Sequence, residues 1–449
     1  MNCMIKYLLL FISFFYYDTV HAQVPDTGRK WSLQECFKYA AEHNIQVNTL
    51  RLNEQISRQV LIAAKGEKIP SLSASVGNSF YNANNNASGN GKLVNQLTSN
   101  GNYSLNSSVV LWNDHYINNN IIQKELLNRS AGLSVQQSQN NITLLITTAY
   151  LDILLAKENE KYLSDLVNTT TSSVQQAQML YDAGSIARVG LLQLKAQLAS
   201  DHYLLVQARN AIRQNMLSLK QILQLPSELP FDIAIPDSVT VVTILPPLKD
   251  VQSTALQNFP EISIAKLGVD IAALDISKSK AGFKPVLKAN AGLGSGYSDV
   301  IIHSVNPKVP YLTQTGNNFY QSLGLTLAIP IFSNRINKTN LQRSRIGYEQ
   351  AKLNLQNGQL VLSQEVEQAY LNASNAQQAF DAADQQLTAA TESYRIVNEQ
   401  FKLGAINAFD LLQQRNQYVQ ALQAYTQAKY SAVLQQKIYE FYMGNPVTL

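Results

Sequence analysis

Cysteine, charged residues and long apolar runs are all scarce in this chain of 449 residues. Charged residues make up 15% of it, against about 25% in ordinary soluble domains, and the formal net charge is +4. A chain so weakly charged lacks the concentrated basic face of a nucleic-acid-binding protein, so no nucleic-acid partner is expected. No internal run of about 18 apolar residues exists, which argues against a helical membrane protein. Hydrophobic residues make up 45% of the chain, too many for a disordered one.

The first 22 residues have the pattern of a secretory signal peptide. Lys6 supplies the positive start, residues 7–17 form a short apolar stretch, and Val20-His21-Ala22 is typical of a cleavage site. A buried N-terminal helix is the alternative interpretation. Removal of a signal peptide would take Cys3 with it and leave Cys36 alone, so no internal disulfide is expected.

Residue patterns typical of enzymes are missing as well. The chain has no G-x-S-x-G and no phosphate-binding loop. Its histidines have no pair at metal-ligand spacing: His21, His43, His115, His202 and His303. We therefore expect neither an enzyme, nor a cofactor, nor a metal site.

What the chain does contain is an internal repeat. Residues 181–186 (YDAGSI) recur as residues 401–406 (FKLGAI), and Leu191-Leu192-Gln193 recurs as Leu411-Leu412-Gln413, at one constant offset. Self-similarity over such a distance indicates two copies of one structural unit. We place the first repeat at 23–225, an irregular connector at 226–248 and the second repeat at 249–449.

Each repeat is predicted to open with a helix and continue with two strands. Ser32 and Glu35 form a capping box for a helix reaching about Lys65, and Asp250 is a plausible cap in the second repeat. Strands are predicted at about 69–80, 102–112, 285–297 and 318–332, with long polar loops between the members of each pair. Apolar residues alternate with polar or small ones, as in the wall of a transmembrane β-barrel. Two soluble hairpins with one face on a core would show the same alternation.

A helical hairpin is predicted after each strand pair, at 114–225 and 334–443. Apolar residues follow a 4-3 spacing from Leu362 to Phe401, and a similar spacing occurs in the first repeat from Ile142 to Tyr181. This spacing predicts a coiled-coil seam in helices on the order of 100 Å long. Each hairpin turns at a glycine, Gly184 or Gly404. Because four strands cannot close a barrel, two or three chains must share one, and three would enclose an aqueous lumen.

This layout resembles the TolC-like outer-membrane efflux proteins, the outer-membrane factors of tripartite efflux and type I secretion systems. The repeated tip at 401–412 and the strand-to-helix junctions at 330–335 and 110–113 carry the resemblance. It implies a mainly α-helical fold with β-strands in the membrane. Three chains would form a homotrimeric, 12-stranded β-barrel in outer-membrane lipid, standing on a periplasmic α-helical barrel. It also implies a passive exit duct for drugs or small molecules that docks onto a periplasmic adaptor (membrane fusion) protein and an inner-membrane pump.

The resemblance further implies a gate at the periplasmic entrance. Asp410 occupies the position of the family's acidic ring, whereas Gln413 stands where a second acid can occur. In the first repeat the equivalent of Asp410 is Gly190, and the nearby Arg188 could pair with Asp410 across the hairpins. The alternative for Asp410 is a carboxylate that only stabilises a helix start.

Adaptor docking is expected at the tips, through Gly184 and Ile186 in one repeat and Gly404 and Ile406 in the other. A type I protein secretion channel and a non-channel periplasmic coiled-coil scaffold or adaptor remain the alternative functions at this point.

Overall fold

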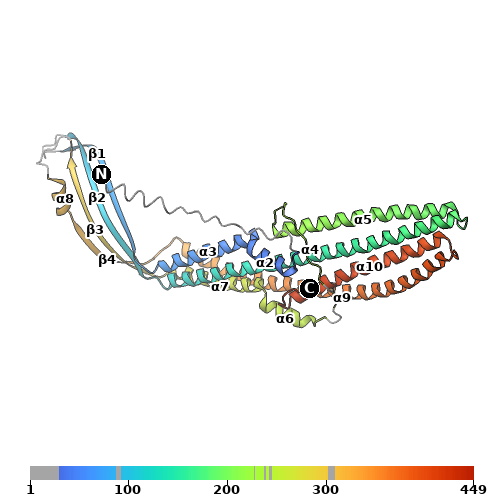
Figure 1. The fold of residues 1–449 in the computed structure, drawn as a ribbon. Coiled ribbons are helices and arrows are strands. Elements are labelled where there is room, and N and C mark those ends of the chain that lie inside the picture. The colour runs from blue at the N-terminus through green and yellow to red at the C-terminus, as the bar shows by residue number, and fades with distance from the viewer. Residues whose placement is uncertain are drawn as a thin grey trace.

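The computed structural model describes residues 30–86, 93–226, 228–236, 239–241, 245–301 and 309–448. The predicted signal peptide lies outside these residues. The chain is long and narrow, with a four-stranded sheet at one end and two pairs of long helices at the other (Figure 1). It is mainly helical, as predicted, and each repeat contains in order a helix pair, two strands and a second helix pair.

The sheet is antiparallel, in the order β1-β2-β3-β4. Its strands are β1 (Ser71–Asn86), β2 (Leu93–Trp112), β3 (Val286–Val300) and β4 (Tyr320–Ala328). The first two are longer than predicted, because residues 81–86 and 93–100 pair as strand where a polar loop was expected. The second predicted loop contains a short helix, α8 (Tyr311–Asn317).

Each strand is continued by a helix, and the helices keep the lateral order of the strands. The helix α3 (Ile45–Gly66) precedes β1, α4 (Tyr116–Asp182) follows β2, α7 (Pro260–Ala281) precedes β3, and α9 (Ile336–Lys402) follows β4. The helix α3 packs on α4, α4 on α7, and α7 on α9. Strands and helices thus form one layer, four elements wide, along the molecule (Figure 1).

The long helices form two hairpins. The helix α4 returns as α5 (Arg188–Leu223), and α9 returns as α10 (Ala408–Phe441). Both α4 and α9 have 67 residues, about 100 Å at 1.5 Å per residue. Along the predicted seam of α9, every member is buried or half-buried, including Leu362, Val366 and Phe401. The 4-3 spacing therefore identified the packed face of the helix.

The first helix differs from its prediction. The Ser32–Glu35 capping box is present, with Ser32 Oγ accepting from the Glu35 N–H at 3.3 Å and Glu35 Oε2 accepting from the Ser32 N–H at 2.8 Å. The helix α2 (Leu33–His43), however, ends before Asn44, whose side chain accepts from the N–H groups of Gln46 and Val47 and starts α3. One predicted helix is therefore two.

The second repeat opens with α6 (Leu248–Asn258), whose N-cap is Pro247. Asp250, predicted as the cap, instead lies in the first turn, where its negative charge suits the helix N-terminus. Pro260 is the first residue of α7, so a break after Asn258 separates α6 from α7.

The junctions from strand to long helix share an unusual backbone in both repeats. Asp114 and His115 have φ of 51° and 64°, and Asn334 and Arg335 have φ of 46° and 65°. The last residue of each pair is the N-cap of its helix, without a side-chain capping bond. These helix starts therefore depend on left-handed backbone geometry, which Asp114 and Asn334 tolerate better than most residues would.

Candidate functional site: the hairpin tips and a two-faced sheet

Both hairpin tips turn through the same backbone motif. Gly184 and Gly404 have φ of +71° and +73°. The Gly184 N–H donates to the Tyr181 carbonyl and the Ser185 N–H to the Leu180 carbonyl, and the second tip repeats these two bonds. This is the Schellman motif, in which glycine is favoured because a side chain strains a left-handed residue. The two glycines thus have a backbone role of their own.

Asp410 lies in the first turn of α10, three residues after the N-cap. The side chain of Asn407 accepts a hydrogen bond from the Asp410 N–H at 3.0 Å, while the Asp410 carboxylate is exposed. Gln413 and Arg188 are also exposed. Among the described residues of a single chain, no ion pair joins Arg188 to Asp410. The carboxylate is therefore open to groups outside the chain, and it also suits the helix dipole.

Gly190, the equivalent of Asp410 in the first repeat, lies against the second tip. A Cβ atom built on Gly190 would lie 3.3 Å from the Cβ of Ala408. The two tips approach so closely here that a larger side chain would have to push α10 away. Close packing of the two tips therefore disfavours a side chain at position 190.

Ile186 and Ile406 are half-buried rather than fully exposed. They pack against a small apolar cluster that joins both hairpins and contains Leu191, Leu194 and Phe401. The Gln176 side chain also donates to the carbonyl of Lys402, at 3.3 Å, across the two tips. The tips thus form one connected surface instead of two independent ends.

Sequence reasoning missed a buried ion pair behind this surface. Arg415 of α10 donates to Asp201 of α5, and both side chains are almost completely buried, at 5% and 1% exposure. Thr170 of α4 donates to the same carboxylate at 2.7 Å, and Gln197 donates to its other oxygen at 2.9 Å. The partners are 214 residues apart, so no local pattern could have revealed them.

At the other end of the chain, the two faces of the sheet differ in chemistry. One face carries exposed apolar side chains, among them Leu72, Leu105, Leu293, Leu323 and Leu325. The other carries Ser, Asn and Thr in cross-strand pairs, such as Ser75 with Ser104 (2.7 Å) and Asn290 with Thr326 (3.2 Å). The exposed fraction of Leu323 is 87%, so no part of the described chain covers the apolar face at that position.

Both edges of the layer also lack a neighbour. Within the described residues, β1 and β4 each pair on one side only. The helices next to them expose further apolar side chains, Ile56 and Val60 on α3 and Ile346 and Leu353 on α9. The layer thus ends on both sides in unpaired strand backbone and exposed apolar side chains. Such edges are expected of one segment of a larger closed wall.

Other kinds of site were sought in the described ranges without result. No group of three or more His, Cys, Asp or Glu side chains there is placed to hold a metal ion. None of the helices in these ranges combines the length and the apolar character needed to cross a membrane.

Comparison with known proteins agrees with this architecture. Residues 251–440 match the sequence profile of the family described as outer membrane efflux protein. No curated protein gives a significant sequence match.

Solved outer-membrane channels match nearly the whole fold. VceC from Vibrio cholerae is 13% identical, with a TM-score of 0.76 over 93% of this chain and 97% of its own. CmeC from Campylobacter jejuni is 16% identical, with a TM-score of 0.75 over 92% and 85%. MtrE from Neisseria gonorrhoeae, solved in its open state, is 19% identical, with a TM-score of 0.75 over 92% and 88%. The predicted family resemblance is thereby confirmed: the chain has the fold of these channels, and residues 251–440 match the sequence profile of the outer membrane efflux proteins.

Proposed function

We propose that this protein is a passive, homotrimeric exit duct in the outer membrane of a Gram-negative bacterium, with a long periplasmic portion. It would carry drugs or other small molecules from the periplasm to the exterior. An inner-membrane pump would drive transport, and a periplasmic adaptor protein would join the pump to the helical tips.

One observation carries this proposal: the sheet exposes an apolar face, a polar face and two unpaired edges. Unpaired backbone is not tolerated in lipid, so β4 of one chain must pair with β1 of the next. Three chains would form a closed wall of twelve strands, wide enough for an aqueous lumen. The leucine face would then contact lipid and the serine–asparagine face would line the lumen.

The helical layer supports the same closure. Since the helices follow the strand order, the exposed apolar residues of α9 in one chain would meet those of α3 in the next. A helical barrel on the order of 100 Å long would continue the lumen below the membrane. The tip surface at its far end would hold both the gate, with Asp410, Gln413 and Arg188, and the docking residues Gly184, Ile186, Gly404 and Ile406.

Native mass spectrometry of the detergent-solubilised protein tests the assembly, and conductance across planar bilayers tests the channel. We expect a trimer that conducts ions. Introducing proline at Leu325, in the unpaired edge strand, should abolish assembly because proline cannot donate to a strand neighbour. A stable monomer with intact strands, or a trimer that never conducts, would overturn the proposal.

Cargo requires a separate measurement in cells. Loss of the gene should raise drug sensitivity and leave the secretion of large proteins unchanged. The opposite pattern would identify a type I protein secretion channel, and recovery of the protein in the soluble periplasm would favour a scaffold or adaptor.

A further inference from the structure

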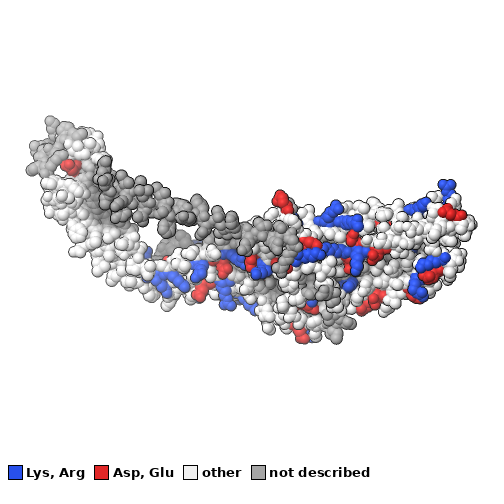
Figure 2. Space-filling model, viewed as in Figure 1, with Lys and Arg blue, Asp and Glu red and all other residues white. Residues whose placement is uncertain are grey.

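Positive charge gathers where the helices meet the sheet, although the chain as a whole is only weakly basic. In Figure 2 blue side chains lie along the helices near this junction, while the described part of the sheet is almost uncharged. At the start of α9, residues 335–345 contain Arg335, Lys338, Arg343 and Arg345 and no acid. All four side chains are exposed.

These cations differ from those farther down the same helix in having no acidic partner. Lys352, Arg395 and Lys402 each form an ion pair with a glutamate three residues before them. Among the described residues, no ion pair involves any of the four cations near the junction. Their charge is therefore available to a partner outside the chain.

The cations can be assigned to two faces of the layer. Arg343 lines a polar groove between α4, α7 and α9, together with Tyr116 and Lys278. Tyr116 also lines a second hollow that reaches Ser71 and Ser108, on the polar face of the sheet. The groove side of the helices is thus continuous with the serine–asparagine face.

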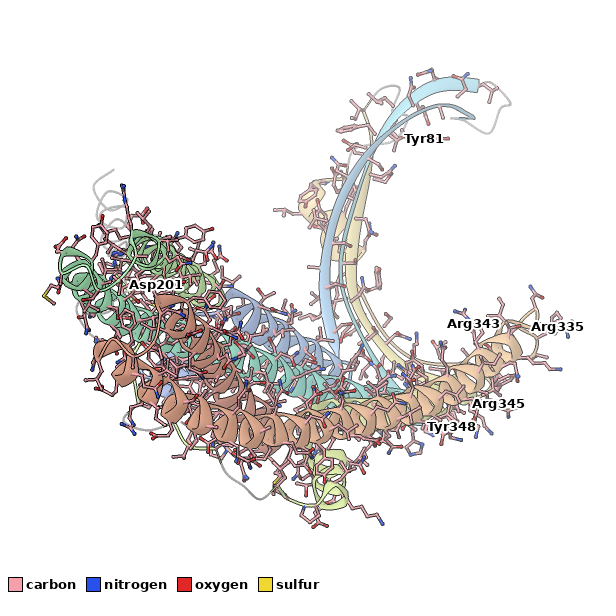
Figure 3. The ribbon with its side chains drawn as sticks, turned by 90° about the vertical axis from the view of Figure 1, so that its right-hand side faces the viewer. Tyr81, Asp201, Arg335, Arg343, Arg345 and Tyr348 are labelled. Carbon is pink, nitrogen blue, oxygen red and sulfur yellow. The ribbon has the colours of Figure 1, made fainter. Side chains whose placement is uncertain are left out.

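Lys338 and Arg345 lie on the opposite side. Two residues along a helix correspond to a turn of about 200°, so Arg345 points away from the groove that Arg343 lines. Figure 3 shows Arg343 and Arg345 on opposite sides of α9 near the base of the sheet. Lys338 is seven residues before Arg345 and therefore shares its side of the helix. By the same reasoning, Lys280 lies opposite Lys278 on α7.

We infer that Lys338 and Arg345, with Lys280 beside them, bind the headgroups of anionic phospholipids in the periplasmic leaflet of the outer membrane. This inference rests on the proposed function, in which the leucine face lies in lipid. The cations then begin where the lipid-facing surface ends. Lys338 and Arg345 are about 10 Å apart along the helix axis, comparable with the depth of a headgroup layer.

A neighbouring copy of the chain is a poorer partner for this charge. In the proposed trimer the adjacent edge is the end of α3, which carries Lys65 and Lys68. Glu67, the one acid between them, already accepts a hydrogen bond from Asn120 at 3.2 Å. Assembly therefore adds positive charge at the junction between the helices and the sheet. Three chains would form a ring of cationic side chains around the duct.

Nanodiscs of defined composition provide the test. The protein is reconstituted in phosphatidylcholine alone or with added phosphatidylglycerol, and both the thermal midpoint and the lipid retained in native mass spectrometry are measured. We expect phosphatidylglycerol to raise the midpoint of the wild type and high salt to cancel that rise. In the variant K338Q/R345Q, retention should fall about fivefold for each cation removed.

The matched control is K288Q/R343Q, which removes the same charge on the groove side: Arg343 lines the groove, and Lys288, opposite Thr326 on the polar face of the sheet, lines the second hollow. It should behave as the wild type, and K338R, which keeps the charge beside an intact Arg345, should retain the wild-type response. An unchanged response in K338Q/R345Q, or an equal loss in the control, would overturn the inference. Conductance in phosphatidylcholine separates the two proposals: conducting trimers without lipid selectivity refute only this one, whereas a failure to conduct refutes the duct itself.

Discussion

Arg415 and Asp201 form a buried ion pair that joins the two helical hairpins behind their tips. Thr170 and Gln197 complete the hydrogen bonding of the carboxylate, so three helices, α4, α5 and α10, meet at this point. Figure 3 shows Asp201 among the packed helices, remote from the sheet. The pair fixes how the second hairpin lies against the first just above the proposed entrance.

Removing only one member of this pair should be costly. Asp201→Ala leaves the Arg415 guanidinium buried without its counter-charge, and we expect a loss of about 3–5 kcal/mol in the free energy of unfolding. The double variant D201L/R415M removes both charges and should recover most of that loss. Chemical denaturation of the solubilised protein measures both effects. Equal stability of D201A and wild type would show that the pair contributes little.

Asp410 should influence ion flow rather than stability. Asp410→Asn keeps the hydrogen bond from its backbone N–H to Asn407 but removes the charge at the proposed entrance. We expect weaker block by divalent cations in planar bilayers and a stability change of at most about 1 kcal/mol from the helix dipole. Asp182→Asn, at the end of α4, is the matched control. An unchanged cation block with a lower stability would identify Asp410 as a helix-start residue only.

Gly404 tests whether the shape of the tip matters for docking. A Cβ atom on Gly404 would meet no atom within 4 Å, so a substitution there acts through the positive φ alone. Gly404→Val should strain the turn by about 1–2 kcal/mol and reduce drug efflux, whereas Gly404→Asn, which tolerates this φ, should retain it. Minimal inhibitory concentrations in cells, with protein levels checked, give the readout. Full efflux with valine would argue against a docking role.

The Cys36 thiol should be unreactive toward alkylating reagents in the folded protein. Its thiol is completely buried, and burial raises its pKa to about 12, with a smaller contribution from the nearby Glu35 carboxylate. Because the thiolate is the reactive form, the folded protein at pH 8 should resist alkylation, and unfolding should restore labelling. Mass spectrometry after maleimide treatment measures this. Rapid labelling of folded protein would show that the core around Cys36 opens.

The architecture was predictable where the sequence carries a regular period. The 4-3 spacing in α4 and α9 identified their packed faces, and the glycine of each tip marked the turn. Both signals are local, since each depends on residues within a few helical turns of one another.

Features held by distant contacts were not predictable. Residues 93–100 are rich in Asn, Ser and Thr, which indicated a loop, yet hydrogen bonds to β1 along this whole stretch make it strand. The break at Asn44 follows from a short polar side chain that caps a new helix, a feature that the apolar period does not reveal. At the tips, Gly190 matched Asp410 in the alignment of the repeats, but only the structure shows its close approach to Ala408.

The left-handed corners at Asp114–His115 and Asn334–Arg335 mark two of the four junctions between the sheet and the helices. Since every strand is continued by one helix, the sheet of one relative could be grafted onto the helices of another at these corners together with the α3–β1 and α7–β3 junctions, without altering the order of either. Such chimaeras would test separately the two proposed roles, with the strands as the membrane wall and the helical tips as the docking surface for the adaptor.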